Sequence, residues 1–583
     1  LYNDKEYTVE ADGSITITIP GAADGGTAIL EGSDVTVKDT NKITVKLHYT
    51  RNDGNYTGWN AWMWADAIGG KQYDFVEENG EMVATMKDIP GRTTNRIGYL
   101  TRKGDWVDRD YYSDQWIDIS DIVSGTVHYY INASAMGGTR VLGSDAIIGN
   151  KIISTEYNRK TNKVVVNMSM PITGSVLDAF TIECTTNNTV IGISSVEKDG
   201  NTYYLTLSED ISSLEALLRS YTITFDGYAY NLMTPNVYSS KEFEEAYTYD
   251  GDDLGLTYTK SASTFKLWAP TADAVELNVY ECGTKGTDDK LNTYTMVKGE
   301  KGVWSYTLKG DWDGKYYTYS VNVNNEVNEA CDPYARTTGV NGNRAMILDL
   351  DSTDPAGWGS DTGAHAGMDY TDAVIYELHV RDLSSDSSSG VSEANRGKFL
   401  GLTETGTKTA GGQPTALDHM INLGITHLHL IPVYDYGSVD ETKLDTPQFN
   451  WGYDPVNYNV PEGSYSTNPY DGASRVSEMK QMVKTLHDNN INVVMDVVYN
   501  HVYDAETFAF NQVVPKADGT YSNGSGCGND TASERSMVHK YIVDSILYWH
   551  DEYHIDGFRF DLVGLIDTVT INKIVEEVHA IDP

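Results

Sequence analysis

The chain has 583 residues, 40% of them hydrophobic and 22% charged, a composition typical of globular proteins long enough for about three to five domains. Its formal net charge of −41 would repel a polyanion and argues against a nucleic-acid partner. No apolar run approaches the roughly 20 residues of a membrane span, and the 4 cysteines lack the spacing of a metal site or a disulfide framework.

Short segments of alternating apolar and polar residues fill the first 355 or so positions. They include ITVKLHY at 43–49, FKLWAP at 265–270 and VELNVY at 275–280. Asp-Gly pairs, which favour tight turns between strands, separate such segments. This part of the chain is therefore predicted to be all-β and to form sandwich modules, without a long amphipathic helix.

The pattern changes near residue 372, where apolar runs begin to alternate with helical segments. The runs are AVIYELHV (373–380), THLHLIPV (426–433), INVVMDVVY (491–499) and HIDGFRFDLV (554–563). Continuous apolar runs of this length suit parallel strands that are covered on both faces. Polar residues end each run, which favours the first half of a (β/α)8 barrel with its site at that end over an open sheet.

Composition divides the chain into five parts. We expect an N-terminal β segment, two β modules, a further β-sandwich before the barrel and a partial (β/α)8 domain, at 1–40, 41–145, 146–243, 244–358 and 359–583.

The fourth apolar run carries the most informative pair of charges. Side chains alternate along a strand, so Arg559 and Asp561 share one face while Phe558 and Phe560 occupy the other. Phe suits contact with helices, which directs the charged pair to the barrel interior. A carboxylate that a guanidinium keeps ionised can act as a nucleophile. The alternative is a buried ion pair with a purely structural role.

Two further polar residues end the third run. Asp496 interrupts an apolar sequence, and a buried carboxylate is costly unless it is paired. Arg559 on the neighbouring strand is its expected partner. His501 follows the strand end, where it could donate to a sugar hydroxyl, although a lone histidine is more often structural.

The loop after the second run contains FNWGYDPVNY at 449–458. Its aromatic side chains can stack on a pyranose ring, and its amides can orient the sugar. Loop packing would explain any one of these residues, but less easily the cluster of Asn450, Trp451 and Tyr453.

These segments carry a family resemblance. FNWGYDP resembles the YNWGYDP signature of type I pullulanases, with Phe449 at the usual tyrosine. DVVYNH, GFRFDLVG and YELHVRD (376–382) resemble segments of the α-amylase superfamily, and the similarity covers about 372–583. The resemblance implies that Asp561 is the nucleophile and Arg559 its electrostatic partner. It also implies that Asp496 and His501 line the subsite beside the cleaved bond, with Tyr453 as the stacking platform.

The β region resembles accessory modules of the same enzymes. Residues 247–281 and 332–350 are similar to the module that precedes the barrel in pullulanases and isoamylases, and 48–67 to the pullulanase-type α-glucan-binding module. Trp62 and Trp64 match the sugar-stacking tryptophans of that module, and Asp114 is a further candidate for its site. The family's binding lysine has two candidate positions, Arg109 and Lys103.

The resemblance implies a debranching hydrolase that cleaves α-1,6-glucosidic bonds in pullulan, amylopectin and related α-glucans with retention of configuration. It implies no obligatory cofactor and allows calcium, and we expect an extracellular or cell-surface location because such polymers do not cross membranes. The alternatives are a neopullulanase- or isoamylase-like enzyme, or a non-catalytic α-glucan-binding protein. The family's acid/base glutamate follows the fifth barrel strand, so we expect residues 1–583 alone to be inactive.

Overall fold

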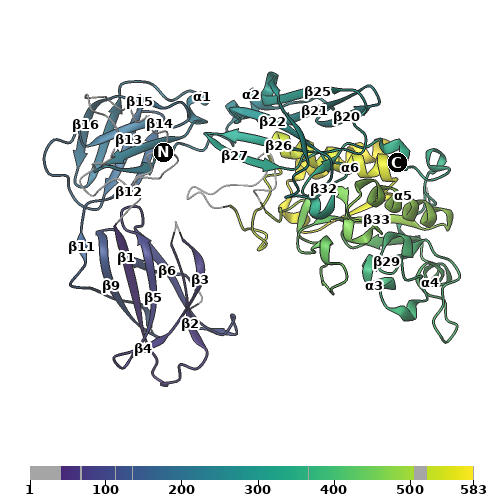
Figure 1. Cartoon of the computed structure of the whole chain (residues 1–583), viewed down its shortest axis with the longest axis horizontal. Coiled ribbons are helices and arrows are strands. Elements are labelled where there is room, and N and C mark those ends of the chain that lie inside the picture. The colour runs from purple at the N-terminus through teal and green to yellow at the C-terminus, as the bar shows by residue number, and fades with distance from the viewer. Residues whose placement is uncertain are drawn as a thin grey trace, which may run out of the picture. The chain divides into compact units, whose positions relative to one another are not determined.

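The structure is a computed structural model that describes residues 41–65, 68–111, 113–133, 135–365, 367–504 and 521–581 (Figure 1). The chain forms two compact units. Unit 1 comprises Leu1–Ser212 and Ser220–Pro235, and unit 2 comprises Ser213–Arg219 and Asn236–Pro583. The expected N-terminal segment, 1–40, lies outside the described residues. Within the described part of the chain, no helix is long and apolar enough to cross a membrane.

Unit 1 begins with two β-sheets. The first has the order β10-β9-β1-β5-β4, with β11 on β9, and the second has the order β3-β2-β6-β7, with β8 on β6. The strands of the first sheet are β1 (Lys42–Thr50), β4 (Val76–Glu78), β5 (Glu81–Pro90), β9 (Ile122–Asn132), β10 (Ala135–Leu142) and β11 (Ile147–Ile148). The strands of the second are β2 (Trp59–Ala65), β3 (Ile68–Asp74), β6 (Arg96–Lys103), β7 (Asp108–Arg109) and β8 (Gln115–Asp118). Inward-facing residues such as Val45, Leu47, Ala61 and Met63 share one buried core.

The first module continues past residue 145, because β11 pairs with β9. The side chain of Lys151 is also fully buried, and its Nζ donates to the carbonyl oxygens of Gly91, Thr94 and Ile119 at 2.8, 2.7 and 3.0 Å. A buried ammonium needs such acceptors. The lysine therefore ties the second module of unit 1 to the loops of the first.

The second module of unit 1 is also built from two antiparallel sheets, ordered β12-β13-β17-β16 and β15-β14-β18-β19. Their strands are β12 (Ile152–Asn158), β13 (Lys163–Met168), β14 (Phe180–Cys184), β15 (Thr189–Ile191), β16 (Ile193–Asp199), β17 (Thr202–Leu207), β18 (Tyr221–Phe225) and β19 (Tyr228–Asn231). Strand β13 alternates half-buried and buried residues, as expected for a strand with one face on a core.

Unit 2 opens with another β-sandwich, whose sheets are β20-β21-β25-β24 and β23-β22-β26-β27, with β28 on β26. The strands are β20 (Gly255–Thr259), β21 (Ala262–Trp268), β22 (Ala274–Tyr280), β23 (Lys290–Thr295), β24 (Val297–Lys298), β25 (Val303–Lys309), β26 (Tyr316–Val323), β27 (Glu326–Ala330) and β28 (Ala345–Met346). Short helices that the sequence reading did not predict also occur, α1 (Leu214–Leu217) and α2 (Lys241–Tyr247). Helix α2 begins because Ser240 caps it, and it buries Phe243.

The remainder of unit 2 is a parallel sheet with helices, ordered β29-β30-β33-β34. Its strands are β29 (Ile375–Leu378), β30 (His427–Leu430), β33 (Asn492–Val497) and β34 (Gly557–Phe560), and its helices are α3 (Val380–Ser384), α4 (Ala416–Leu423), α5 (Gly472–Asp488), α6 (Ser536–Tyr553) and α7 (Thr568–Ile581). The antiparallel strands β31 (Tyr434–Tyr436) and β32 (Pro455–Pro461) lie between β30 and α5 in sequence. The prediction of all-β modules followed by the first four β/α units of a barrel is confirmed.

The predicted apolar face of α5 is buried in full. Its five members all have no exposed surface: Val476, Met479, Met482, Val483 and Leu486. This face packs in the core of unit 2, as the 3.6-residue period requires.

The parallel strands are shorter than the apolar runs that predicted them. The fourth run begins at His554, but this residue caps the C-terminus of α6 with a φ of 54° and stacks on Trp358 at 4.0 Å. At the other end, Leu562 has a φ of 45°, so β34 covers only Gly557–Phe560. A helix cap and a turn therefore account for apolar residues that the sequence reading assigned to the strand.

Candidate active site

The ion pair expected between neighbouring strands is present at the carboxyl end of the parallel sheet. The register of β33 and β34 places Asp496 opposite Arg559. Arg559 Nη1 donates to both carboxylate oxygens of Asp496, at 3.0 and 3.1 Å. Burial alone would lower the pKa of Arg559, but the hydrogen bonds to Asp496 and to Asp561 raise it overall. The guanidinium is thus permanently charged.

Asp496 is fully buried and is satisfied by three side chains. Besides Arg559, the Tyr453 hydroxyl donates to its Oδ2 at 2.8 Å, and His429 Nε2 lies 3.3 Å from the same oxygen. Burial, and then the hydrogen bond to Asp496, raises the pKa of the Tyr453 phenol. The phenol therefore stays protonated and keeps donating. With this set of partners, Asp496 serves to fix Arg559 and Tyr453 in place.

Asp561 lies in the turn immediately after β34. Its backbone N–H donates to Val497 O at 2.9 Å, and its carbonyl accepts from Asn500 Nδ2 at 3.1 Å. Its carboxylate Oδ1 receives a hydrogen bond from Arg559 Nη1 at 2.9 Å, and the side chain is 20% exposed. The backbone of Asp561 is therefore fixed by Val497 and Asn500, and its carboxylate is oriented by the Arg559 guanidinium, yet solvent can still reach it.

His501 lies near this carboxylate but is almost fully enclosed, with 4% of its surface exposed. Its Nδ1 is 2.6 Å from Asn500 Oδ1. Burial lowers the pKa of the imidazole, against the opposing effect of the Tyr453 backbone and of Asp561. The neutral ring is thus oriented by Asn500, and the expected contact with a sugar hydroxyl stays a prediction.

The loop from 449 to 455 presents aromatic rings to solvent. Phe449 and Trp451 are 75% and 59% exposed, and their rings meet edge to face with centroids 6.0 Å apart. Asn450 holds the loop, because its Oδ1 accepts from Gly452 N at 2.5 Å and its Nδ2 donates to Asp454 Oδ2 at 3.3 Å. Exposed aromatic rings on an anchored loop can stack on sugar rings at little entropic cost.

Two histidines that the sequence reading passed over also belong to the site. His379 Nε2 lies 2.7 Å from the carbonyl oxygen of Asn450, and His429 contacts Asp496. Both interrupt or end apolar strands, at the same end of the sheet as Asp496. A polar residue at the carboxyl end of each parallel strand is the signal that could have identified them.

A second candidate site lies on the outer face of the β2 sheet in unit 1. Trp62 and Trp64 are both half-buried on one face of β2. A Cβ at Gly70 would lie 2.6 Å from Trp62 Nε1, and one at Gly98 would lie 2.1 Å from Trp64. Both rings therefore lie close over glycine backbone, and the Arg102 guanidinium lies 4.5 Å from the centroid of the Trp62 ring.

Two tryptophans that the sequence reading did not single out extend this face. Trp106 and Trp116 are 44% and 38% exposed; Trp106 lies 6.0 Å from Trp62, and Trp116 lies 5.6 Å from Trp64. The strand pairing explains the second contact, because Gly98 is opposite both Trp64 and Trp116.

The register also separates the two candidates for the binding cation. Arg109 is opposite Arg102, which is opposite Asn60, so Arg109 shares the tryptophan face. Lys103 is opposite Trp59, so its side chain lies on the other face of the sheet. Asp114 is exposed just before β8. Of the two candidates, Arg109 is therefore the one on the tryptophan face, which it shares with Arg102.

Replacing Trp62 and Trp64 together with alanine is expected to weaken binding of the chain to pullulan by roughly 30-fold. Each stacked ring contributes on the order of 1 kcal/mol, and 1.4 kcal/mol corresponds to a factor of ten. Affinity electrophoresis in pullulan measures the change. Tyr130→Ala, which removes a 38% exposed ring from the other sheet of the module, is the control. Unchanged retardation of the double variant would refute the role, and loss of folding would mean that both rings are core residues.

Among the described residues, one group of three side chains has oxygens close enough together to bind a metal ion. Oxygens of Asp435, Glu441 and Glu462, all buried, lie within 4.8 Å of one another. Arg475 already enters this group, with Nη2 3.0 Å from Glu441 and Nη1 3.4 Å from Asp435. Glu462 accepts from Ser464 N at 2.8 Å. Calcium prefers six to eight oxygen ligands and no cation in the shell, so these residues fit an ion-pair cluster and not a calcium site.

Three family profiles match the chain. The profile described as "Bacterial pullanase-associated domain" covers residues 43–134 and "Carbohydrate-binding module 48 (Isoamylase N-terminal domain)" covers 253–335. The profile described as "Alpha amylase, catalytic domain" covers 403–523. Their order is the order of modules that the sequence predicts.

Curated and solved relatives agree with the profiles. A pullulanase from Bacillus subtilis is 40% identical over 364 residues, which are 61% of this chain and 49% of the relative. The crystal structure of a pullulanase from Paenibacillus barengoltzii in complex with maltohexaose and α-cyclodextrin is 49% identical, with a TM-score of 0.57 over 61% of this chain and 54% of that one. A pullulanase from Anoxybacillus sp. LM18-11 complexed with maltotriose is 36% identical, with a TM-score of 0.62 over 74% of this chain and 61% of that one.

The chain is similar to type I pullulanases of the α-amylase superfamily. It spans about half the length of the curated relatives it matches. These similarities confirm the resemblance from which the residue roles were inferred. The roles of Asp561, Arg559 and the other site residues stay predictions.

Proposed function

We propose that the chain is part of a debranching enzyme that hydrolyses α-1,6-glucosidic bonds in pullulan and branched α-glucans with retention. The observation that carries the proposal is the Asp561 carboxylate at the carboxyl end of the parallel strands, held 2.9 Å from Arg559 Nη1. The similarity to pullulanases and the exposed aromatic loop beside the sheet support it. Structures of relatives in complex with maltohexaose and maltotriose support an α-glucan as the ligand.

In the proposed reaction, a carboxylate oxygen of Asp561 attacks the anomeric carbon as the glycosidic C–O bond breaks. A second carboxyl group donates a proton to the leaving oxygen, and then takes one from the water that releases the sugar from Asp561. The guanidinium of Arg559 donates a hydrogen bond to the Asp561 carboxylate and orients it for the attack. Asp496 holds Arg559 so that its charge is directed at the reacting carboxylate.

Pullulan digestion tests the assignment. The enzyme is assayed both as residues 1–583 and in a form that continues to the length of its curated relatives. We expect the longer form to release mainly maltotriose, because the loop at 449–455 matches the pullulanase signature. Panose as the main product would support a neopullulanase-like enzyme, and preferential cleavage of amylose would refute the debranching assignment.

A non-catalytic α-glucan-binding role is the second candidate, and the tryptophan face of unit 1 favours it. Binding without turnover by both forms would support this role. We also propose an extracellular or cell-surface location, because the proposed substrates are polymers that do not cross membranes, and we propose that no cofactor is required.

A further inference from the structure

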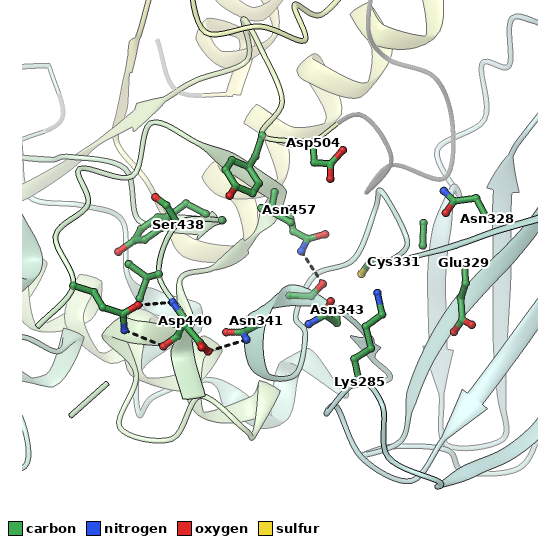
Figure 2. Close-up of a pocket in the computed structure, with 18 residues that line it drawn as sticks. Lys285, Asn328, Glu329, Cys331, Asn341, Asn343, Ser438, Asp440, Asn457 and Asp504 are labelled. Carbon is green, nitrogen blue, oxygen red and sulfur yellow. Dashed lines mark hydrogen bonds between the residues drawn. The ribbon is translucent and has the colours of Figure 1, made fainter. Parts of the chain in front are cut away.

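A pocket of about 630 Å³ lies in unit 2 between its β-sandwich and the loops that follow β31 and β33 (Figure 2). Figure 2 shows Asn328 on the sandwich side and Ser438 and Asp440 on the other side, with Lys285 below them. Pockets of this size typically hold small molecules or short oligomers. None of its lining residues belongs to the Asp496–Arg559–Asp561 network.

The floor of the pocket is fixed by hydrogen bonds. Asn341 Nδ2 donates to Asp440 Oδ1 at 3.1 Å, and Gln448 Nε2 donates to the Asp440 carbonyl at 3.0 Å. Asn457 Nδ2 donates to Gly342 O at 3.0 Å. Polar side chains that are already held in place need little ordering when a ligand binds.

Tyr503 supplies a flat surface on the pocket wall. A Cβ at Gly437 would lie within 2.3, 2.5 and 2.7 Å of three carbons of the Tyr503 ring, so the ring lies directly against the glycine backbone. The Tyr503 N–H donates to Pro455 O at 2.9 Å, which fixes the residue, and the side chain stays 48% exposed. A supported ring with an exposed part is suited to stacking on a sugar ring.

The charges of the pocket disfavour an anionic ligand. Its lining includes one lysine, Lys285, and three carboxylates, Glu329, Asp440 and Asp504. Glu329 Oε1 accepts hydrogen bonds from the hydroxyls of Tyr280 and Thr318, at 2.5 and 2.7 Å. Amides, a phenol ring and carboxylates around a polar pocket match a neutral molecule rich in hydroxyl groups.

We propose that this pocket is a non-catalytic binding site for a segment of α-glucan chain. Tyr503 stacks on a sugar ring, and Lys285 and Asn343 donate to hydroxyl groups. The choice of glucan as the ligand rests on the proposed function. The pocket also contacts the loop at 449–455. The Ser438 N–H donates to Asp454 Oδ2 at 2.7 Å, and the Ser438 hydroxyl accepts from Asn450 Nδ2. A glucan in the pocket would therefore lie next to the loop that carries Trp451.

The test uses chain 1–583 with Trp62 and Trp64 replaced by alanine, so that unit 1 does not dominate binding. Hydrogen exchange is followed in peptides that cover 437–444 and 326–331, with and without maltohexaose as the probe. Titration calorimetry gives the affinity. The variants are Tyr503→Ala and Asn343→Ala, and the control is Tyr470→Ala, which removes a ring of similar exposure, 50%, elsewhere in unit 2.

We expect maltohexaose to slow exchange in both peptides. Tyr503→Ala should abolish this protection. It should also weaken the affinity of the pocket for maltohexaose, measured by calorimetry, roughly tenfold, or about 1.4 kcal/mol. Asn343→Ala should weaken it less, and Tyr470→Ala should leave it unchanged. Unchanged exchange in both peptides, or equal affinities of Tyr503→Ala and Tyr470→Ala, would overturn the proposal. Protection of the pocket in a chain whose longer form hydrolyses no pullulan would retain this site and refute the proposed function instead.

Discussion

Asp561→Asn is expected to lower pullulan hydrolysis by on the order of 10⁴-fold or more in the form of the enzyme that continues to the length of its curated relatives. An amide cannot supply the anionic oxygen that attacks the anomeric carbon, and removal of a catalytic nucleophile costs factors of this size in other enzymes. The fold should persist, because the backbone contacts of Asp561 with Val497 and Asn500 do not involve its carboxylate. Initial rates on pullulan and a melting curve measure both effects.

A matched control and a chemical rescue make this test specific. Asp445→Asn changes an exposed carboxylate in the same unit and should leave the rate unchanged. Asp561→Ala with added azide and an activated glucosyl donor should form a glycosyl azide of inverted configuration, because azide takes the position of the missing carboxylate. Retention of more than a tenth of the activity by Asp561→Asn would show that another group is the nucleophile.

Arg475→Ala is expected to destabilise unit 2 by about 3–5 kcal/mol. Arg475 on α5 is fully buried and binds Asp435 and Glu441, together with the carbonyl oxygens of Gly339, Pro461 and Pro469. Its removal leaves buried carboxylates without a counter-charge, which is costly at this burial. Burial already raises the pKa of Asp435 to about 7. Calorimetric melting of the chain measures the loss.

The same helix provides the control for this variant. Gln481→Ala alters an exposed position of α5 and should change stability by less than about 0.5 kcal/mol. Adding Asp435→Asn and Glu441→Gln to Arg475→Ala should recover part of the lost stability, because the uncompensated charges are then removed. Equal melting temperatures of Arg475→Ala and Gln481→Ala would contradict an electrostatic role for the cluster.

The sequence was sufficient to predict the Asp496–Arg559 pair because both residues interrupt apolar strands that are neighbours in a parallel sheet. Alternation along β2 likewise predicted that Trp62 and Trp64 share a face, which the burial pattern of β2 confirms. Local periodicity determines such features, so a single strand or a pair of strands is enough to infer them.

Other parts of the site depend on contacts that no local pattern encodes. Arg475, Asp435, Glu441 and Glu462 come from α5, β31 and two loops, and each looks like an ordinary surface charge in the sequence. The hydrogen bond from Tyr453 to Asp496 joins residues 43 positions apart. Such groups become buried only when several segments pack together, and that packing is set by the tertiary fold.

Lys151 also limits how the first module of unit 1 could be exchanged between proteins. A recombination point at residue 145 would separate this lysine from the carbonyl oxygens of Gly91, Thr94 and Ile119 that it holds. Each of these acceptors would lose the lysine donor, although Ile119 O would still accept from Ile122 N–H, and the cost is about 1–3 kcal/mol for each group that is left unpaired and that water cannot reach. A segment that can be exchanged between proteins without this loss is therefore longer than the sandwich itself and extends at least through Lys151.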